Sequence, residues 1–167
     1  MGREVVIRTA RTELTSWLSG DVDDLLEVHS DPVTMRFVRH GRPETRDETA
    51  ALIDDYIDEH ARWGWTKWRI ADHDAHLIGR AGFGADGSGR ELGYTLRRDQ
   101  WGQGLATEVA EALVRWHRDH APEVPLHAYA AVENAASQRI LTKIGFQPVD
   151  VRGYHGEACH LYRLPGI

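Results

Sequence analysis

Apolar residues alternate with polar or small ones along residues 91–96, the period-2 pattern of a β-strand. From residue 105 onward the apolar positions recur every three or four residues, which predicts a helix with one buried face. That stripe consists of Leu105, Val109, Leu113 and Trp116. A polar turn and the sequence Gly102-Gln103-Gly104 separate the two elements. The chain is thus predicted to run from a strand, through a glycine-rich turn, into a helix.

The glycines of this turn indicate a site for an anion. Glycine lets a ligand approach the backbone closely, and the free N–H groups of a helix's first turn attract negative charge. A strand, a Gly-x-Gly turn and a helix start are together typical of a pyrophosphate site. The alternative is a tight turn that uses glycine without any ligand, and so short a motif does not decide between the two.

The same patterns divide the rest of the chain into short elements. Two alternating stretches lie at residues 3–9 and 11–18, and the second is predicted to form the first strand. A helix is expected after Asp21, a short helical piece over residues 33–38, and a longer helix from Thr45 to about Arg62. Further strands are expected over residues 65–71, 77–84, 126–132, 146–151 and 159–164.

Capping residues support two of these helices. Thr45 and Glu48 fit a capping box, in which each side chain bonds the other residue's backbone N–H. Asn134 is predicted to cap the last helix, with Ser137 at its third position and Gly145 at its end. The buried face of that helix is expected to be Ile140, Leu141 and Ile144. The order of elements predicts one mixed α/β (α+β) domain over residues 1–167.

Composition narrows the class of protein. A chain of 167 residues is long enough for one domain with a real core. Its net charge of −6 argues against a nucleic-acid partner, because nucleic-acid-binding domains carry basic patches or stripes. Cys159 is the single cysteine, so no disulfide can form within the chain, and no apolar run approaches the ~18 residues of a membrane span. These features favour a cytoplasmic protein with neither nucleic-acid nor membrane partners.

Four motifs together give the chain a resemblance to a known family. They are Leu77-Ile-Gly79, Glu91-Leu-Gly-Tyr-Thr-Leu96, Trp101-Gly-Gln-Gly-Leu-Ala-Thr-Glu108 and Asn134-Ala-Ala-Ser-Gln-Arg-Ile-Leu-Thr-Lys-Ile-Gly-Phe146. The motifs occur in the order and spacing of the GCN5-related N-acetyltransferase (GNAT) superfamily, which the chain resembles over roughly its whole length. The resemblance is strongest to the ribosomal-protein N-terminal acetyltransferase-like branch.

The resemblance implies a twisted, mainly antiparallel sheet, flanked by helices, that splays between the strands of residues 91–96 and 126–132. Acetyl-coenzyme A would lie in this opening as the acetyl donor. Its pantetheine arm would follow the backbone near Leu96, and Asn134 would contact it from the other side. Its pyrophosphate would rest on the helix start, which comprises Trp101, Gly102, Gln103, Gly104, Leu105, Ala106 and Thr107.

Two positions depart from the family pattern. Trp101 stands where the phosphate motif commonly begins with Gln or Arg, which puts one phosphate contact in doubt. Leu141 stands where many members carry a tyrosine that protonates the leaving thiolate. Ser137 is the substitute candidate for this acid, and the alternative is that it only completes the helix cap.

The resemblance implies direct attack of an amine on the thioester in a ternary complex. An ammonium is not a nucleophile, so a base must take its proton. Glu91 is the candidate, because it lies on the strand beside the expected acetyl group. The alternative is a structural carboxylate near the turn.

The acceptor is expected to be a primary amine, either a protein N-terminus or a small cationic amine. In the family its binding site is built around residues 29–44, 63–65 and 153–157. The candidate acceptor-binding residues there are His29, Phe37, Trp63, Trp65 and Tyr154. Aromatic faces favour cations, but arginines in the same stretches oppose them, so the sign of the groove stays open.

The sequence also bears on other assignments. A dinucleotide-binding domain is disfavoured because Thr107 replaces the third glycine and only ~35 residues follow Glu133. A non-catalytic domain that binds coenzyme A for regulation is not excluded by the sequence. No metal is expected, because no Cys/His set has ligand spacing. The oligomeric state also stays open, with a homodimer among the alternatives.

Overall fold

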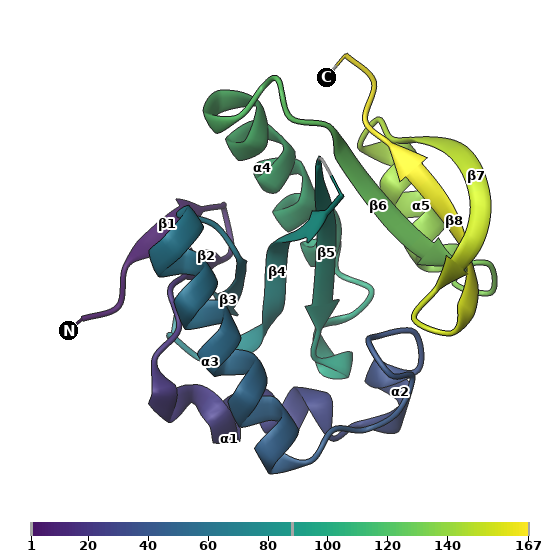
Figure 1. Cartoon of the computed structure of the whole chain (residues 1–167). Coiled ribbons are helices and arrows are strands. Elements are labelled where there is room, and N and C mark those ends of the chain that lie inside the picture. The colour runs from purple at the N-terminus through teal and green to yellow at the C-terminus, as the bar shows by residue number, and fades with distance from the viewer. Residues whose placement is uncertain (1, 88, 167) are drawn as a thin grey trace.

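The computed structural model describes residues 2–87 and 89–166, whose strands form one eight-stranded sheet (Figure 1). The strands are β1 (Val5–Arg8), β2 (Glu13–Thr15), β3 (Lys67–Ala71), β4 (Leu77–Asp86), β5 (Gly89–Leu96), β6 (Leu126–Ala131), β7 (Gln147–Tyr154) and β8 (Glu157–Arg163), in the order β1-β2-β3-β4-β5-β6-β8-β7. Each neighbouring pair is antiparallel except β5 with β6. The predicted mixed, mainly antiparallel sheet is confirmed.

Helices cover the sheet through two apolar clusters. The helices are α1 (Val22–His29), α2 (Pro32–Met35), α3 (Arg46–Trp63), α4 (Leu105–His120) and α5 (Ala135–Lys143). One cluster joins α4 and α5 to the central strands around Trp68 and Phe83, which are both fully buried. The second joins α1 and α3 around Leu25 and Ile53. None of the helices in the described ranges has the length and apolar content needed to cross a bilayer.

Two of the predicted helix caps are confirmed. Thr45 Oγ1 accepts from the Glu48 N–H at 3.2 Å, and the Glu48 carboxylate accepts from the Thr45 N–H at 3.1 Å, which completes the capping box of α3. Asn134 Oδ1 accepts from the Ser137 N–H at 3.2 Å at the start of α5. Each bond satisfies a backbone donor that the helix itself cannot pair.

The sheet opens between β5 and β6. The two strands are paired only where Arg90, Glu91 and Leu92 lie beside residues 126–128, and they diverge beyond Leu92. Figure 1 shows β5 and β6 separating, with α4 as the connection between them. The splay expected from the resemblance is therefore present. A doubly wound parallel sheet, which the dinucleotide alternative requires, is absent from the described part of the chain.

The two ends of the sheet differ from the sequence-based expectation. The first alternating stretch forms a strand of its own, because β1 pairs with β2, and β2 ends at Thr15 instead of continuing to residue 18. The β7–β8 hairpin extends to residue 154, beyond the predicted end at residue 151. Its turn places both His155 and Gly156 at positive φ (49° and 81°), the backbone geometry of a tight hairpin turn. In α5 only Leu141 is fully buried, whereas Ile140 and Ile144 are half-buried.

Gly79 permits the close contact between β4 and β5 and should not tolerate a side chain. A Cβ at this position would lie 2.1 Å from the Thr95 carbonyl oxygen. Gly79→Ala should therefore lower the free energy of unfolding by about 1–3 kcal/mol, measured by urea denaturation. Gly20→Ala is the matched control, because a Cβ there meets nothing within 4 Å. Equal stability of the two variants would contradict this account of the strand pairing.

Candidate active site

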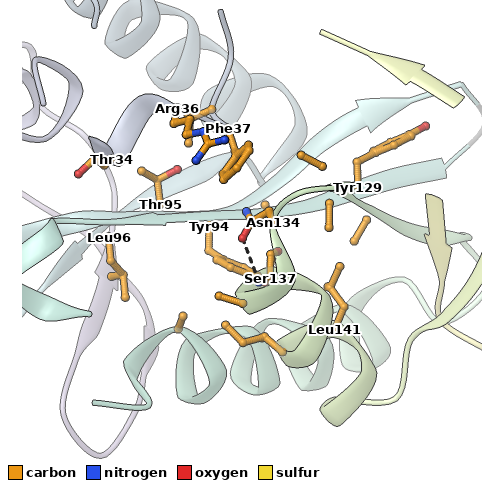
Figure 2. A pocket seen from close by; sticks show the side chains of 18 of the residues that line it. Thr34, Arg36, Phe37, Tyr94, Thr95, Leu96, Tyr129, Asn134, Ser137 and Leu141 are labelled. Atoms are coloured by element: carbon orange, nitrogen blue, oxygen red, sulfur yellow. Dashed lines mark hydrogen bonds between the residues drawn. The ribbon is translucent and has the colours of Figure 1, made fainter. Parts of the chain in front are cut away.

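A cavity of about 1000 Å³ occupies the opening between β5 and β6. Its walls come from several parts of the chain: residues 33–41, Lys67 of β3, Arg80 of β4, strand β5, the start of α4, and residues 128–159 of β6, α5 and the β7–β8 hairpin. Figure 2 shows side chains from these parts converging on one space, with Tyr94 and Leu96 on one side of β5 and Thr95 on the other. The cavity therefore reaches both faces of β5.

The glycine-rich turn presents unpaired backbone donors to the cavity. Gly102 and Gly104 have φ of 76° and 78°, a left-handed conformation that disfavours any side chain. The first intrahelical bond of α4 runs from Glu108 N to Gly104 O at 3.1 Å, so the N–H groups before Glu108 have no acceptor within the helix. This is the geometry of an anion site at a helix N-terminus.

Arg11 braces this turn from outside the cavity. Its guanidinium donates to the Gln103 carbonyl and to the Glu108 carboxylate, both at 2.9 Å. Although burial opposes the shift, hydrogen bonds from Thr9 and Arg11 hold the pKa of Glu108 below its usual range. The carboxylate thus stays ionised and keeps Arg11 against the turn.

Eight of the nine predicted donor-site residues line the cavity, namely Leu96, Trp101, Gly102, Gly104, Leu105, Ala106, Thr107 and Asn134. Gln103 does not line it, because its backbone carbonyl is turned toward Arg11. Trp101 stands where the family commonly has Gln or Arg. Its Nε1 donates to the Leu96 carbonyl at 2.9 Å, so this side chain connects the turn to the end of β5. Among the described residues, the backbone of residues 93–96 has no strand partner on its β6 side.

Ser137 and Tyr94 form a hydroxyl pair at the cavity wall. Their oxygens lie 2.9 Å apart, and both residues line the cavity (Figure 2). Burial raises the pKa of Tyr94 to about 12, so its phenol is protonated at neutral pH. Tyr94 was not among the sequence-predicted site residues, although its place in the alternating strand gives its direction. Leu141, at the family's tyrosine position, is buried and also lines the cavity.

The candidate base Glu91 lies on the opposite face of β5 from Tyr94. Its carboxylate is 3.0 Å from Lys67 Nζ, and both residues line the cavity. A Cβ at Gly93 would lie 3.0 Å from Glu91 Oε1, so the bare glycine leaves the space that this ion pair fills. Lys67 was not predicted from the sequence, because its approach to Glu91 depends on the pairing of β3, β4 and β5.

The β7–β8 hairpin brings Tyr154 and His155 into the cavity wall near Glu91 and Lys67. Burial raises the pKa of Tyr154, and the negative charge of Glu91 adds to the effect. Burial lowers the pKa of His155, and the nearby charge of Lys67 lowers it further. Tyr154 stacks on Tyr129 with ring centroids 3.9 Å apart, which fixes the hairpin against β6. His155 is therefore neutral at pH 7.

Three of the five predicted acceptor-binding residues do not reach the cavity. Phe37 and Tyr154 line it, but His29, Trp63 and Trp65 do not. Trp63 and Trp65 stack on each other with centroids 4.9 Å apart, and Arg90 lies over Trp65. His29 is fully buried beneath the wall, because α1 directs it into the protein interior. The expectation that these three contact the acceptor does not match the geometry.

His29 instead connects two parts of the cavity wall. Its Nδ1 lies 2.8 Å from Glu44, and its Nε2 accepts from Arg80 Nε at 3.0 Å. Arg39, on the 33–41 segment, holds the other Glu44 oxygen at 2.5 Å. Burial lowers the pKa of His29 to about 4, although the bond to Glu44 opposes this. The pKa of Glu44 is held at about 2 by its bonds to His29 and Arg39, against the effect of burial.

A possible metal-ligand group lies away from this cavity. Within the described chain, Asp72, Asp74 and His76 place ligand atoms within 4.8 Å of one another on the β3–β4 turn. Asp72 already accepts from the N–H groups of Asp74 and His76, as expected of an Asx-type turn. None of the three lines the cavity.

The family described as "Acetyltransferase (GNAT) domain" matches residues 11–147. The chain belongs to this family and is an acetyltransferase, which confirms the resemblance seen in the four motifs. It is 25% identical over 146 residues to the uncharacterised N-acetyltransferase YoaA of Bacillus subtilis, covering 85% of this chain and 82% of YoaA.

Solved structures share the fold. A GNAT-family acetyltransferase from Bacillus anthracis matches 94% of this chain and 95% of its own, with a TM-score of 0.79 and 20% identity. The ribosomal L7/L12 α-N-protein acetyltransferase RimL, in complex with coenzyme A, matches 98% of this chain and 100% of its own, with a TM-score of 0.81 and 17% identity. These neighbours show that the chain shares their fold.

The buried His29 predicts that acid destabilises the fold. Its pKa is about 4 in the folded state against 6.5 when exposed, so between these pH values the unfolded chain binds an extra proton. The free energy of unfolding is therefore fully retained above pH 6.5 and falls toward pH 4, by up to about 1.4 kcal/mol per pH unit from this residue. Glu44 adds its own loss only below about pH 4.5. His29→Asn should lessen this dependence between about pH 7 and about pH 5. Burial also lowers the pKa values of His117 and His155, which account for the remainder.

Urea unfolding at these two pH values measures the effect. His76→Asn is the control, because His76 is exposed on the β3–β4 turn and should leave the wild-type difference intact. A wild-type difference that is undiminished in His29→Asn would assign the acid sensitivity to other groups.

Proposed function

We propose that this acetyltransferase moves an acetyl group from acetyl-coenzyme A to a primary amine by direct attack in a ternary complex. The observation that carries the proposal is the single cavity that joins a helix N-terminus on one side of β5 to the Glu91 carboxylate on the other. One end of this space suits an anionic donor, and the other suits an amine that must lose a proton.

The donor end fits coenzyme A on the chain's own geometry. The N–H groups around Gly102 and Gly104 can bond a diphosphate without displacing any intrahelical bond. The unpaired β6 side of residues 93–96 offers backbone donors and acceptors to an amide-containing arm. The neighbour RimL, which has the same fold, binds coenzyme A, and this supports the assignment.

Glu91 is proposed to take the proton of the attacking amine. Acetyl-coenzyme A supplies the electrophilic thioester carbonyl, and the amine must be neutral to attack it. The Glu91 carboxylate is acceptor-only when ionised, and Lys67 holds it in position at 3.0 Å. Glu91 therefore removes the ammonium proton, directly or through water, before or during formation of the C–N bond.

Ser137 is proposed to donate the proton that the departing sulfur needs. Its hydroxyl can give a proton to the thiolate, and Tyr94 at 2.9 Å can replace that proton from its own phenol. Because the pKa of Tyr94 is about 12, Tyr94 keeps a proton to donate at neutral pH. The pair thus offers a substitute for the tyrosine that Leu141 replaces.

The acceptor is proposed to be a primary amine, either the N-terminus of a protein or a small molecule. Phe37 and Tyr154 give the acceptor side two aromatic surfaces, which favour an ammonium or a nearby cation. RimL acts on the α-amine of a ribosomal protein, and this supports an N-terminus among the candidates.

Gly104→Val should abolish binding of acetyl-coenzyme A. The left-handed φ of 78° at this position strains any β-branched residue, so the turn must change and the amides lose their direction. Calorimetric titration with acetyl-coenzyme A measures the loss.

Gly64→Val is the matched control for Gly104→Val. Gly64 has the same φ of 78°, ends α3, and does not line the cavity. This variant should lose similar stability but bind acetyl-coenzyme A with wild-type affinity. Unchanged affinity in Gly104→Val would place the donor phosphates elsewhere.

Glu91→Gln should lower kcat by about 10²–10⁴-fold while leaving acetyl-coenzyme A affinity intact, because the amide cannot accept the proton. Release of free thiol from acetyl-coenzyme A, with a panel of N-terminal peptides, lysine peptides, polyamines and aminoglycosides, measures this across pH. The pH–rate profile of the variant should differ from that of the wild type. Ser137→Ala should lower kcat in the same assay.

Full activity of Glu91→Gln with an unchanged profile would mean that another group is the base. An acetyl group trapped on Ser137 or Cys159 would contradict direct attack. Turnover with hydroxyl acceptors alone would refute the amine assignment and leave the donor site intact.

A further inference from the structure

Arg80 is a buried cation on the acceptor side of the cavity. It lies on β4, is 3% exposed, and lines the cavity wall. Its cross-strand neighbour on β5 is Thr95, and side chains directly opposite each other in a sheet point to the same face. Figure 2 shows Thr95 on the side of Phe37 and Arg36, away from Tyr94 and Leu96. Arg80 therefore faces the acceptor chamber, the part of the cavity on this face of β5, which Phe37, Lys67 and Glu91 line.

Three other cations of the cavity wall already have carboxylate partners. Lys67 pairs with Glu91 at 3.0 Å, Arg39 with Glu44 at 2.5 Å, and Arg36 with Glu133 at 2.7 Å. Arg80 has no carboxylate within ion-pairing distance anywhere in residues 2–87 and 89–166. An arginine is rarely this buried unless it is paired.

His29 orients Arg80 without neutralising it. The Arg80 Nε donates to the His29 Nε2, which must therefore be the unprotonated nitrogen of a neutral ring. The Nδ1–H of that ring donates to Glu44, so the ring is fixed from both sides. One of the five guanidinium donors is used in this way, and four are left on a fixed, charged group at the cavity wall.

We propose that Arg80 binds an anionic group, a carboxylate or a phosphate, on the same molecule that carries the acceptor amine. This inference rests on the proposed amine acetylation and narrows its acceptor class. A guanidinium can hold such a planar or tetrahedral oxyanion through two parallel N–H bonds. Amino acids, acidic peptides and phosphorylated amines therefore fit the chamber better than polyamines, which would bring a second cation toward Arg80.

Paired amines that differ only in the acid test this on the wild-type protein. Suitable pairs are lysine with cadaverine, phenylalanine with phenethylamine, the C-terminally amidated dipeptides Ser-Asp with Ser-Asn, and phosphoethanolamine with ethanolamine. Thiol release should favour the acid-bearing member of at least one type of pair on the order of ten- to a hundredfold in kcat/KM. The last pair separates a phosphate preference from a carboxylate preference.

Arg80→Gln links any preference to this residue. The amide keeps a donor for His29 but removes the charge, so the preference should vanish through a higher KM for the acid-bearing amine. The KM for acetyl-coenzyme A should change by less than about threefold. Arg69→Gln is the matched control, because Arg69 lies directly opposite Arg80 on β3, is 5% exposed, and does not line the cavity. It should retain the preference.

Calorimetric titration of the same pairs into the protein saturated with coenzyme A gives a readout that does not need turnover. Tighter binding of the acid-bearing amine without any thiol release would support the Arg80 site while contradicting the proposed function. Turnover with no preference in any pair would overturn the Arg80 site and leave the proposed function standing. The Arg80 site would also be overturned by a preference that persists in Arg80→Gln, or by a rise in KM that is confined to acetyl-coenzyme A. The absence of both turnover and preferential binding would refute both.

Discussion

The structure depends on the loss of pairing between two neighbouring strands. β5 and β6 share three registered residue pairs and then separate at Leu92, although each continues for several residues. Unpaired backbone inside a protein is costly unless another partner satisfies it. The open strands therefore define both the position of the cavity and the kind of ligand that suits it, one that brings its own hydrogen-bonding groups along an extended arm.

Glycines give this opening its shape on both faces of β5. Gly102 and Gly104 adopt left-handed conformations and aim the start of α4 at the donor end. On the acceptor face, Gly93 leaves room for the Lys67–Glu91 pair. Gly79 lies opposite Leu96, on the other face, and lets β4 approach the end of β5. The two kinds of glycine act through different physics: the first pair through backbone torsion, the second through the absence of a Cβ.

Local sequence was sufficient for the donor end and for most of the fold. The Gly-x-Gly turn, the Asn134 cap and the strand at residues 91–96 are each encoded within a few residues, so periodicity and capping rules located them. The acceptor end depends on contacts between distant segments. His29 was expected in the acceptor site, and only the packing of α1 against β4 shows that it is buried and bonds Arg80 from the protein interior. Trp63 and Trp65 directly precede β3 in the sequence and were therefore expected near the acceptor. In the structure they stack on each other outside the cavity.

The starts of two helices, α4 and α5, meet at this one cavity. Each contributes about half a positive elementary charge from its aligned peptide dipoles, and neither contribution needs a lysine or arginine. The chain as a whole carries a net charge of −6 and so repels an anionic donor at long range. Salt screens that repulsion over about 8–10 Å, whereas the dipoles act at contact, where little water intervenes. Attraction to the proposed donor thus resides in peptide groups that neither titrate nor move, and it persists at any pH at which the backbone stays folded.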